Sequence, residues 1–198
     1  MSSGDASARL FVALELPDPP AQALARWAAA LESSDPALRA VRADALHATL
    51  CFLGQRPVAE IDAIAAACAE AVGPPVLELA TGGLVGFPPR RPRVLAVELE
   101  DRSGGLARLE ARLSAALAAL GVYQPEARAF RPHVTIARVR GGRLGPGGLA
   151  QLGASRPAAL SQARFEARTV TLFRSQTAPG GAVYTPLASA FLELPRSI

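Results

Sequence analysis

Residues 47–53, His-Ala-Thr-Leu-Cys-Phe-Leu, and residues 133–139, His-Val-Thr-Ile-Ala-Arg-Val, open with the same pattern of histidine, any residue, threonine and an apolar residue. These two stretches contain the only histidines of the 198-residue chain, which has seven threonines. A given histidine is followed by threonine two positions later in about 4% of random cases, so a doubled pattern is expected about once in a thousand. We therefore interpret the two stretches as a functional pair.

Each pattern also closes a longer repeat. The run Leu-Phe-Val-Ala-Leu-Glu-Leu at residues 10–16 resembles Val-Leu-Ala-Val-Glu-Leu-Glu at residues 94–100. Arg9 lies 38 positions before His47, and Arg93 lies 40 positions before His133. A strand, a helix and a strand with His-x-Thr thus occur twice at nearly equal spacing. This repeat predicts two pseudo-equivalent lobes, related by an approximate two-fold axis, that present their His-x-Thr strands to a shared cleft.

The remaining elements follow from apolar periodicity and from glycine and proline. Strands are predicted at residues 9–16, 46–53, 76–84, 94–100, 133–139, 164–173 and 184–194, the last two joined by a turn at residues 179–181. Helices are predicted at residues 20–32, 58–72 and 104–120. Residues 141–157 are rich in glycine and proline, and they predict a loop with a weak helix near Leu149. No linker interrupts the chain, so residues 1–198 are expected to form one domain of two lobes.

Composition excludes several kinds of chemistry. The chain has no lysine and no asparagine, and all 21 of its basic residues are arginine. Schiff-base catalysis, lysyl-adenylate formation, a Walker-type phosphate lysine and N-glycosylation are therefore excluded. An alanine- and arginine-rich composition of this kind is also what a GC-rich genome produces. The net charge of +4 and a pI near 10.0 nevertheless favour an anionic partner, and arginine binds phosphate in a planar, bidentate manner.

The sequence also predicts where the protein is found. Residues 1–8 are polar and contain no cationic segment followed by an apolar core, and no apolar run is long enough to span a membrane. Two cysteines, Cys51 and Cys68, are too few for a disulfide framework and are expected to be free thiols in a reducing compartment. We expect a soluble cytoplasmic protein with no membrane partner.

The four polar residues of the doubled pattern suit chemistry at phosphorus. Positions i and i+2 of a strand share a face, so each histidine lies beside its threonine while the intervening residues face the core. Two imidazoles can act as acid and base near neutral pH, and two hydroxyls can donate hydrogen bonds to non-bridging phosphate oxygens. Two histidines without a carboxylate or cysteine at ligand spacing make a poor metal site, so no metal is expected. The alternative is that both histidines are structural and the threonines reflect strand propensity.

Several stretches resemble the 2H phosphoesterase superfamily, and most closely its RNA 2',3'-cyclic phosphodiesterases, also called 2'-5' RNA ligases. The resemblance covers nearly the whole chain. It is carried by Arg9-Leu-Phe-Val-Ala-Leu, His47-Ala-Thr-Leu-Cys-Phe-Leu-Gly, Gly86-Phe-Pro, Arg91-Pro-Arg-Val-Leu, Phe130-Arg-Pro-His-Val-Thr-Ile-Ala-Arg138 and Tyr184-Thr-Pro-Leu. It implies a bilobal α+β fold in which two antiparallel sheets have helices outside and the active site in the groove between them.

The resemblance also implies a reaction. His47 would donate a proton to the leaving O3' of an RNA 2',3'-cyclic phosphate, and His133 would accept a proton from water, giving an RNA 2'-phosphate. Thr49 and Thr135 would complete the site. No cofactor is implied, and the partner would be an RNA 3' end or a small cyclic nucleotide. A monomer is expected.

Two alternatives remain open. The same groups could run the reverse reaction and join a 5'-OH to a cyclic end through a 2'-5' bond. The protein could instead be a non-catalytic module that binds a nucleotide or RNA. The symmetry of the two motifs also leaves the acid and base roles undecided from the residues themselves.

Three arginines are candidates for phosphate binding. Arg138 matches an arginine that the resemblance places near the phosphate, but its odd offset from His133 points it away from the cleft unless the strand ends or bulges. Arg131, two residues before His133, has the right parity. Arg91 lies in a cluster with Arg90 and Arg93, which could follow an RNA backbone or be a solvated loop.

Three further side chains have two interpretations each. Cys51 shares the His47 face by parity, but it lies about 13 Å along the strand, too far to pair with His47 as a nucleophile, and is expected to fill the core. Phe52 and Tyr184 are either core residues or surfaces on which a base could stack.

Overall fold

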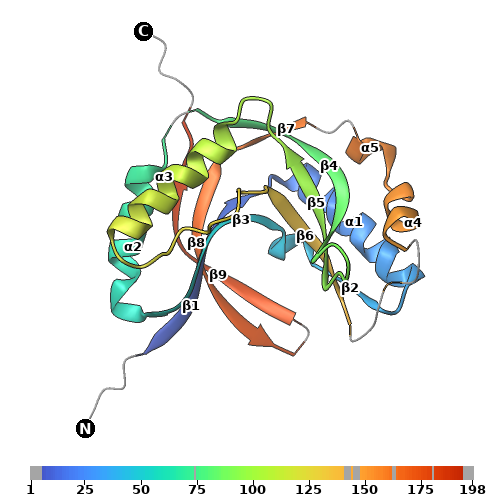
Figure 1. The fold of residues 1–198 in the computed structure, drawn as a ribbon, viewed down its shortest axis with the longest axis horizontal. Helices are drawn as coiled ribbons and strands as arrows, with labels where there is room; N and C mark the ends of the chain where they lie inside the picture. The colour runs from blue at the N-terminus through green and yellow to red at the C-terminus, as the bar shows by residue number, and fades with distance from the viewer. Residues whose placement is uncertain are drawn as a thin grey trace.

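The computed structural model describes residues 6–73, 75–140, 144, 148–161, 164–179 and 181–193. Nine strands of this part of the chain form one sheet, and eight of them follow the order β7-β4-β5-β6-β3-β1-β8-β9 with antiparallel neighbours. The sheet curls strongly, and helices lie outside it on two sides (Figure 1). The predicted α+β class is confirmed.

The sheet has two halves, each built from one copy of the sequence repeat and its neighbours. One half contains β1 (Ser7–Glu15), β3 (His47–Pro57), β8 (Thr169–Ala178) and β9 (Gly181–Phe191). The other contains β4 (Leu77–Phe87), β5 (Val94–Glu100), β6 (His133–Val139), β7 (Arg164–Ala167) and β2 (Leu38–Ala40). The halves meet where β3 and β6 pair at Ala48 and Val134. The two predicted antiparallel sheets are thus continuous with each other through a single residue pair.

Two helices each follow a strand of one half of the sheet but pack on the other half. The described helices are α1 (Asp18–Ser34), α2 (Ile61–Ala71), α3 (Gly105–Ala119), α4 (Gly148–Ala154) and α5 (Ala158–Ser161), with short 3-10 turns at Ala43–Ala45 and Val58–Glu60. Helix α1 follows β1 but packs on β2 and β6 of the other half, and α3 follows β5 but packs on β3. Figure 1 shows α2 and α3 outside one half of the curled sheet and α1, α4 and α5 outside the other half. Each half is therefore covered by a helix that the other half supplies.

Apolar stripes hold these helices on the sheet. Pro19 and Pro20 occupy the first turn of α1, where a missing backbone N–H costs nothing, and its buried face carries Leu24, Trp27 and Leu31. The buried face of α3 carries Leu106, Leu109, Leu113 and Leu117, all with no exposed surface. None of the helices in the described ranges is long and apolar enough to cross a membrane.

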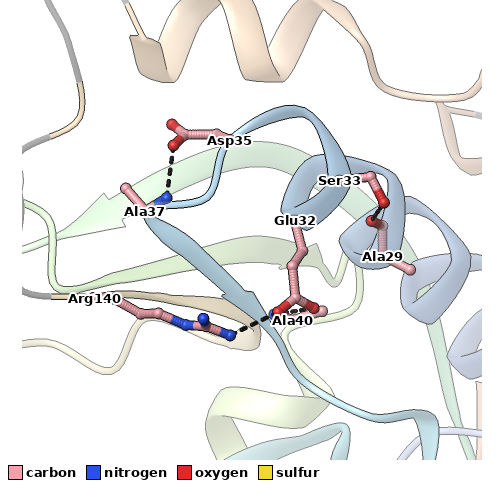
Figure 2. A network of polar contacts seen from close by, with 7 residues as sticks. All are labelled: Ala29, Glu32, Ser33, Asp35, Ala37, Ala40 and Arg140. Atoms are coloured by element: carbon pink, nitrogen blue, oxygen red, sulfur yellow. Dashed lines mark hydrogen bonds and ion pairs between the residues drawn. The ribbon is translucent and has the colours of Figure 1, made fainter.

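A polar clamp fixes the end of α1 to the strands beneath it (Figure 2). One carboxylate oxygen of Glu32 accepts a hydrogen bond from the backbone N–H of Ala40 in β2 at 3.2 Å. The other accepts one from the Arg140 guanidinium, just past β6, at 2.8 Å. The Asp35 carboxylate accepts a hydrogen bond from the backbone N–H of Ala37 in the turn between α1 and β2. The clamp holds β2 against β6, the strand that carries His133.

The structure differs from the sequence prediction in several places. The predicted strand at residues 164–173 is two strands, because the chain breaks at Arg168 and passes from one end of the sheet to the other. The short strand β2 and the short helix α5 were not predicted, whereas α4 lies within the predicted loop and confirms the helix expected near Leu149. Gly180 of the predicted turn and Leu194 of the last predicted strand lie outside the described residues.

Candidate active site

The two histidines make the same local hydrogen bond. Each is the first residue of its strand, and its ring Nδ1 faces the backbone carbonyl oxygen two residues earlier. The distances are 2.9 Å from His47 Nδ1 to Ala45 O and 2.7 Å from His133 Nδ1 to Arg131 O. A carbonyl oxygen only accepts, so Nδ1 must carry the proton in both rings. In the neutral ring, Nε2 is then the atom free to accept a proton.

The junction between the halves brings the four predicted residues together. Ala48 and Val134 pair across it and are fully buried, so the residues that flank them face the opposite side of the sheet. Those residues are His47, Thr49, His133 and Thr135, all partly buried. Because the pair is antiparallel, it turns His47 toward Thr135 and Thr49 toward His133. We call this side of the sheet, which the helices do not cover, the helix-free face.

Aromatic rings surround His47. Its ring centroid lies 4.8 Å from that of Phe11, 6.2 Å from that of Phe173 and 5.0 Å from that of Tyr184. Burial lowers the pKa of His47 to about 4, the positive charges of Arg138 and His133 also lower it, and the bond to Ala45 opposes them. In the free protein at pH 7, His47 is therefore neutral.

His133 has different surroundings. One ring packs near it, that of Phe87, at a centroid distance of 4.7 Å. Arg131 lies over the same Phe87 ring at 5.5 Å, and its guanidinium pairs with the Glu98 carboxylate at 2.7 Å. Glu98 is the register partner of His133 on β5. Arg131 precedes the first residue of β6, so strand parity does not set its direction, and its guanidinium is paired with the Glu98 carboxylate.

A bulge determines where Arg138 points. Thr135 pairs with Ala96, but Ala137 pairs with Leu95, so Ile136 has no partner on β5. The extra residue shifts the alternation by one, and Arg138, opposite Val94, lies on the same face as Thr135. Its side chain is exposed and, within the described ranges, pairs with no carboxylate. The sequence analysis expected Arg138 to face the cleft only if its strand bulged, and β6 has such a bulge.

Arg91 is placed apart from these residues. It lies in the exposed turn between β4 and β5, where the Arg91 backbone N–H donates to Pro88 O at 3.2 Å. The same turn contacts the far end of β6, because Val139 N donates to Arg93 O. Arg91 is thus at the end of β6 opposite His133, and its role in binding stays a prediction.

A bulge in β3 turns Cys51 to the face opposite the one that strand alternation predicts. Thr49 pairs with Ala13 and Cys51 pairs with Val12, so Leu50 has no partner on β1. Cys51 consequently faces the core with no exposed surface, and its prediction as a core filler is confirmed, but its assignment to the His47 face was wrong. Burial raises the pKa of its thiol to about 12. Both Cys51 and Cys68 are free and buried.

Sequence reasoning missed a polar group on the helix-free face. The Thr171 hydroxyl donates to the Glu15 carboxylate and shares a hydrogen bond with the Ser189 hydroxyl at 2.8 Å. Glu15 is the register partner of His47, just as Glu98 is of His133. The repeat of residues 10–16 and 94–100 contained this symmetry, because each copy has a glutamate near its end. No three His, Cys, Asp or Glu side chains gather as a metal site would need within the described ranges.

Comparison with known proteins agrees with this architecture. A structure of TT0787 from Thermus thermophilus superposes with a TM-score of 0.77 at 28% identity, over 93% of this chain and 97% of that one. E. coli LigT, solved as a complex with 3'-AMP, superposes with a TM-score of 0.72 at 27% identity, over 94% of this chain and 99% of that one. An Aeropyrum pernix protein named RNA 2',3'-cyclic phosphodiesterase is 33% identical over 124 residues, 61% of this chain and 68% of that protein.

The resemblance drawn from the sequence is confirmed at the level of class: the fold is that of the 2H phosphoesterases. The family model described as the 2'-5' RNA ligase superfamily matches residues 16–178. This chain belongs to the 2'-5' RNA ligase superfamily.

Proposed function

We propose that the protein hydrolyses an RNA 2',3'-cyclic phosphodiester to a 2'-phosphomonoester without a metal ion, using His47 and His133 as acid and base. The observation that supports the proposal is the pairing of β3 with β6 at Ala48 and Val134, since the two histidines and two threonines flank this pair. The carbonyl bonds at both Nδ1 atoms leave both Nε2 atoms for proton transfer. The name of the Aeropyrum pernix relative and the 3'-AMP bound to LigT support a nucleotide phosphodiester as substrate.

The proposed step moves two protons. His133 Nε2 accepts a proton from water as the water oxygen bonds to phosphorus. The bond from phosphorus to O3' breaks, and protonated His47 donates its Nε2 proton to O3'. The products are a 2'-phosphate and a 3'-hydroxyl, so water has been added across the P–O3' bond. His133 then loses its proton to solvent and His47 regains one.

The other groups stabilise negative charge. Hydroxyls of Thr49 and Thr135 donate hydrogen bonds to the two non-bridging oxygens, where charge increases in the transition state. Arg138, unpaired by any described carboxylate, supplies a positive charge on the same face. Arg131 and Arg91 are weaker candidates, because Arg131 is neutralised by Glu98 and Arg91 lies at the far end of β6.

His47 must be protonated to act as the acid, and its low pKa opposes this. With a pKa of about 4, only a small fraction of His47 is protonated at pH 7 in the free protein. A bound phosphodiester brings a negative charge beside the ring, and an adjacent opposite charge raises the pKa of an imidazole. In this proposal the substrate therefore promotes protonation of its own acid catalyst.

The decisive assay uses an oligonucleotide with a 2',3'-cyclic phosphate in the presence of EDTA. We expect a 2'-phosphate product, and we expect His47→Ala and His133→Ala each to lower kcat at least about 100-fold, the usual contribution of a general acid or base. Gln22→Ala, on the exposed side of α1, is the control and should retain full activity with the same circular dichroism. Near wild-type turnover by either histidine variant would contradict the assignment.

The same assay separates the alternatives. The superfamily is named after 2'-5' RNA ligases. In ligation by this site, the 5'-OH of a second RNA would take the place of water at His133. Adding a 5'-OH oligonucleotide would then yield a longer product with a 2'-5' bond. A non-catalytic module would bind the cyclic end and give no product over hours.

A further inference from the structure

A large aromatic side chain stands exposed on the helix-free face. Phe52 has 45% of its surface accessible, although it belongs to a strand whose neighbours Cys51 and Leu53 are buried. It pairs in register with Phe11, and Val12 pairs with Cys51. Because register partners share a face, Phe52 lies on the side of Phe11 and His47, and the bulge at Leu50 causes this placement.

Phe52 continues the aromatic surface around His47. The Phe11 ring lies 4.8 Å from the His47 ring, and Phe52 is the cross-strand neighbour of Phe11. Cross-strand side chains have Cβ atoms about 5 Å apart, so Phe52 is one strand spacing beyond the ring that touches the proposed acid. Phe52 is therefore the next aromatic side chain across the sheet from Phe11, farther from His47.

A positive charge accompanies this ring. The Arg9 guanidinium carbon lies 4.6 Å from the centroid of Phe52. Arg9 precedes Phe11 by two positions on β1 and shares its face. No described carboxylate pairs with Arg9. An exposed ring and an unneutralised guanidinium together offer a stacking surface and a contact for a phosphate, the two features that bind single-stranded nucleic acid.

We propose that Phe52 and Arg9 form a binding site for the nucleotide on the 5' side of the cyclic-phosphate nucleotide. The base of that nucleotide stacks on Phe52, and Arg9 contacts its phosphate. The terminal nucleotide occupies the surface over His47, so the next base along the RNA falls on the neighbouring ring. This inference rests on the proposed function, and it makes a single-stranded RNA end a better substrate than a cyclic mononucleotide.

The test compares kcat/KM on a dinucleotide ending in a 2',3'-cyclic phosphate with kcat/KM on the cyclic mononucleotide of the same terminal base. We expect the wild-type ratio to favour the dinucleotide. Phe52→Leu keeps an apolar side chain but removes the flat ring, and it should lower the ratio roughly 5- to 100-fold, the usual effect of losing one stacked base. Phe52→Trp should preserve the ratio.

The matched control is Phe191→Ala. Phe191 is also an exposed phenylalanine, with 65% of its surface accessible, but it lies at the end of β9, and its register partner is Thr169 rather than a residue of the site. Its substitution should leave activity and the ratio unchanged. With the wild-type protein, a dinucleotide that lacks the 5' base should lower the ratio as much as Phe52→Leu does. The Phe52→Leu protein should show no further loss on this abasic dinucleotide.

A second measurement separates this inference from the proposed reaction. A dinucleotide with 2-aminopurine at the 5' position is mixed with the His133→Ala protein, and its fluorescence should be quenched on binding in a manner that Phe52→Leu abolishes. Quenching without turnover by the wild type would contradict the proposed function and retain the stacking site. An unchanged ratio and unchanged quenching in Phe52→Leu would overturn the inference, as would an equal loss on both substrates.

Discussion

His47 and His133 make the same hydrogen bond to a preceding carbonyl but differ in their surroundings. Three aromatic rings enclose His47, whereas one ring packs near the more open His133. Equivalent positions in a sequence repeat therefore carry histidines with different surroundings, and burial lowers the pKa of His47. A pH profile cannot assign their roles, because exchanging acid and base leaves the two limbs of the bell at the same pKa values.

A change of leaving group can assign the roles. In a substrate whose O3' is replaced by sulfur, the departing anion is stable and needs little protonation. We expect His47→Ala to recover part of its roughly 100- to 10,000-fold loss on this substrate, while His133→Ala does not, because water still needs a base. The measured quantity is the ratio of the two recoveries. Recovery of His133→Ala alone would reverse the roles, and equal recovery would mean that the histidines are not specialised.

The burial of His47 also makes folding stability depend on pH. Its pKa is about 4 in the folded protein and 6.5 in an unfolded chain, so the unfolded chain binds the proton first as pH falls. The free energy of unfolding should then decrease by about 2 kcal/mol between pH 7 and pH 5 through this residue. Urea unfolding of the wild type and His47→Phe at both pH values measures the difference. A wild type and variant with the same pH dependence would show that His47 titrates normally.

At the scale of elements, bulges in β3 and β6 decide which side chains enter the site. Strand alternation alone predicts the positions of His47, Thr49, His133 and Thr135, since no bulge separates each histidine from its threonine. Just beyond each threonine, Leu50 of β3 and Ile136 of β6 have no partner on the neighbouring strand, and the alternation of side chains reverses there. For this reason the sequence could not place Arg138, and it placed Cys51 on the wrong face. A bulge depends on the partner strand, which no local pattern contains.

The bulge in β6 leads to a prediction for Arg138. Its positive charge lowers the pKa of His47, so Arg138→Gln should raise that pKa, as measured by NMR titration of the ring. It should also lower kcat/KM about 10- to 100-fold if Arg138 contacts the phosphate, the usual value of a hydrogen bond to a charged group. Arg91→Gln, in the exposed turn, should leave the His47 pKa unchanged. An unaltered His47 titration in Arg138→Gln would place Arg138 away from the ring.

The predicted helices and strands agree best with the structure where the apolar pattern extends over many residues. The apolar stripes of α1 and α3 and the runs of β1 and β5 were all predictable, because each buries one continuous face. The break at Arg168 left a trace in the sequence, since the buried residues Phe165, Ala167 and Val170 do not alternate across it. The three-residue β2 left none, because it is held by the Glu32 clamp and its pairing with β6 rather than by its own pattern (Figure 2).

At the scale of the whole molecule, the two halves are interlocked. Each is covered by a helix from the other, and the only strand pairing between them is that of Ala48 with Val134 within the described residues. The repeat in the sequence predicted two lobes but could not show this exchange, because helix packing is not visible in periodicity. A half of the chain expressed alone would therefore leave the apolar face of its helix without the sheet it covers.

The order of strands in the sheet also affects the protein during its synthesis. Among the described strands, β1 is synthesised first, but its sheet neighbour β8 and the following β9 are synthesised last. A nascent chain that ends before Thr169 already holds both histidines, but it lacks Phe173 and Tyr184, two of the three rings that enclose His47. The enclosed environment of His47, and with it the low pKa, therefore forms only after β8 and β9 have been synthesised.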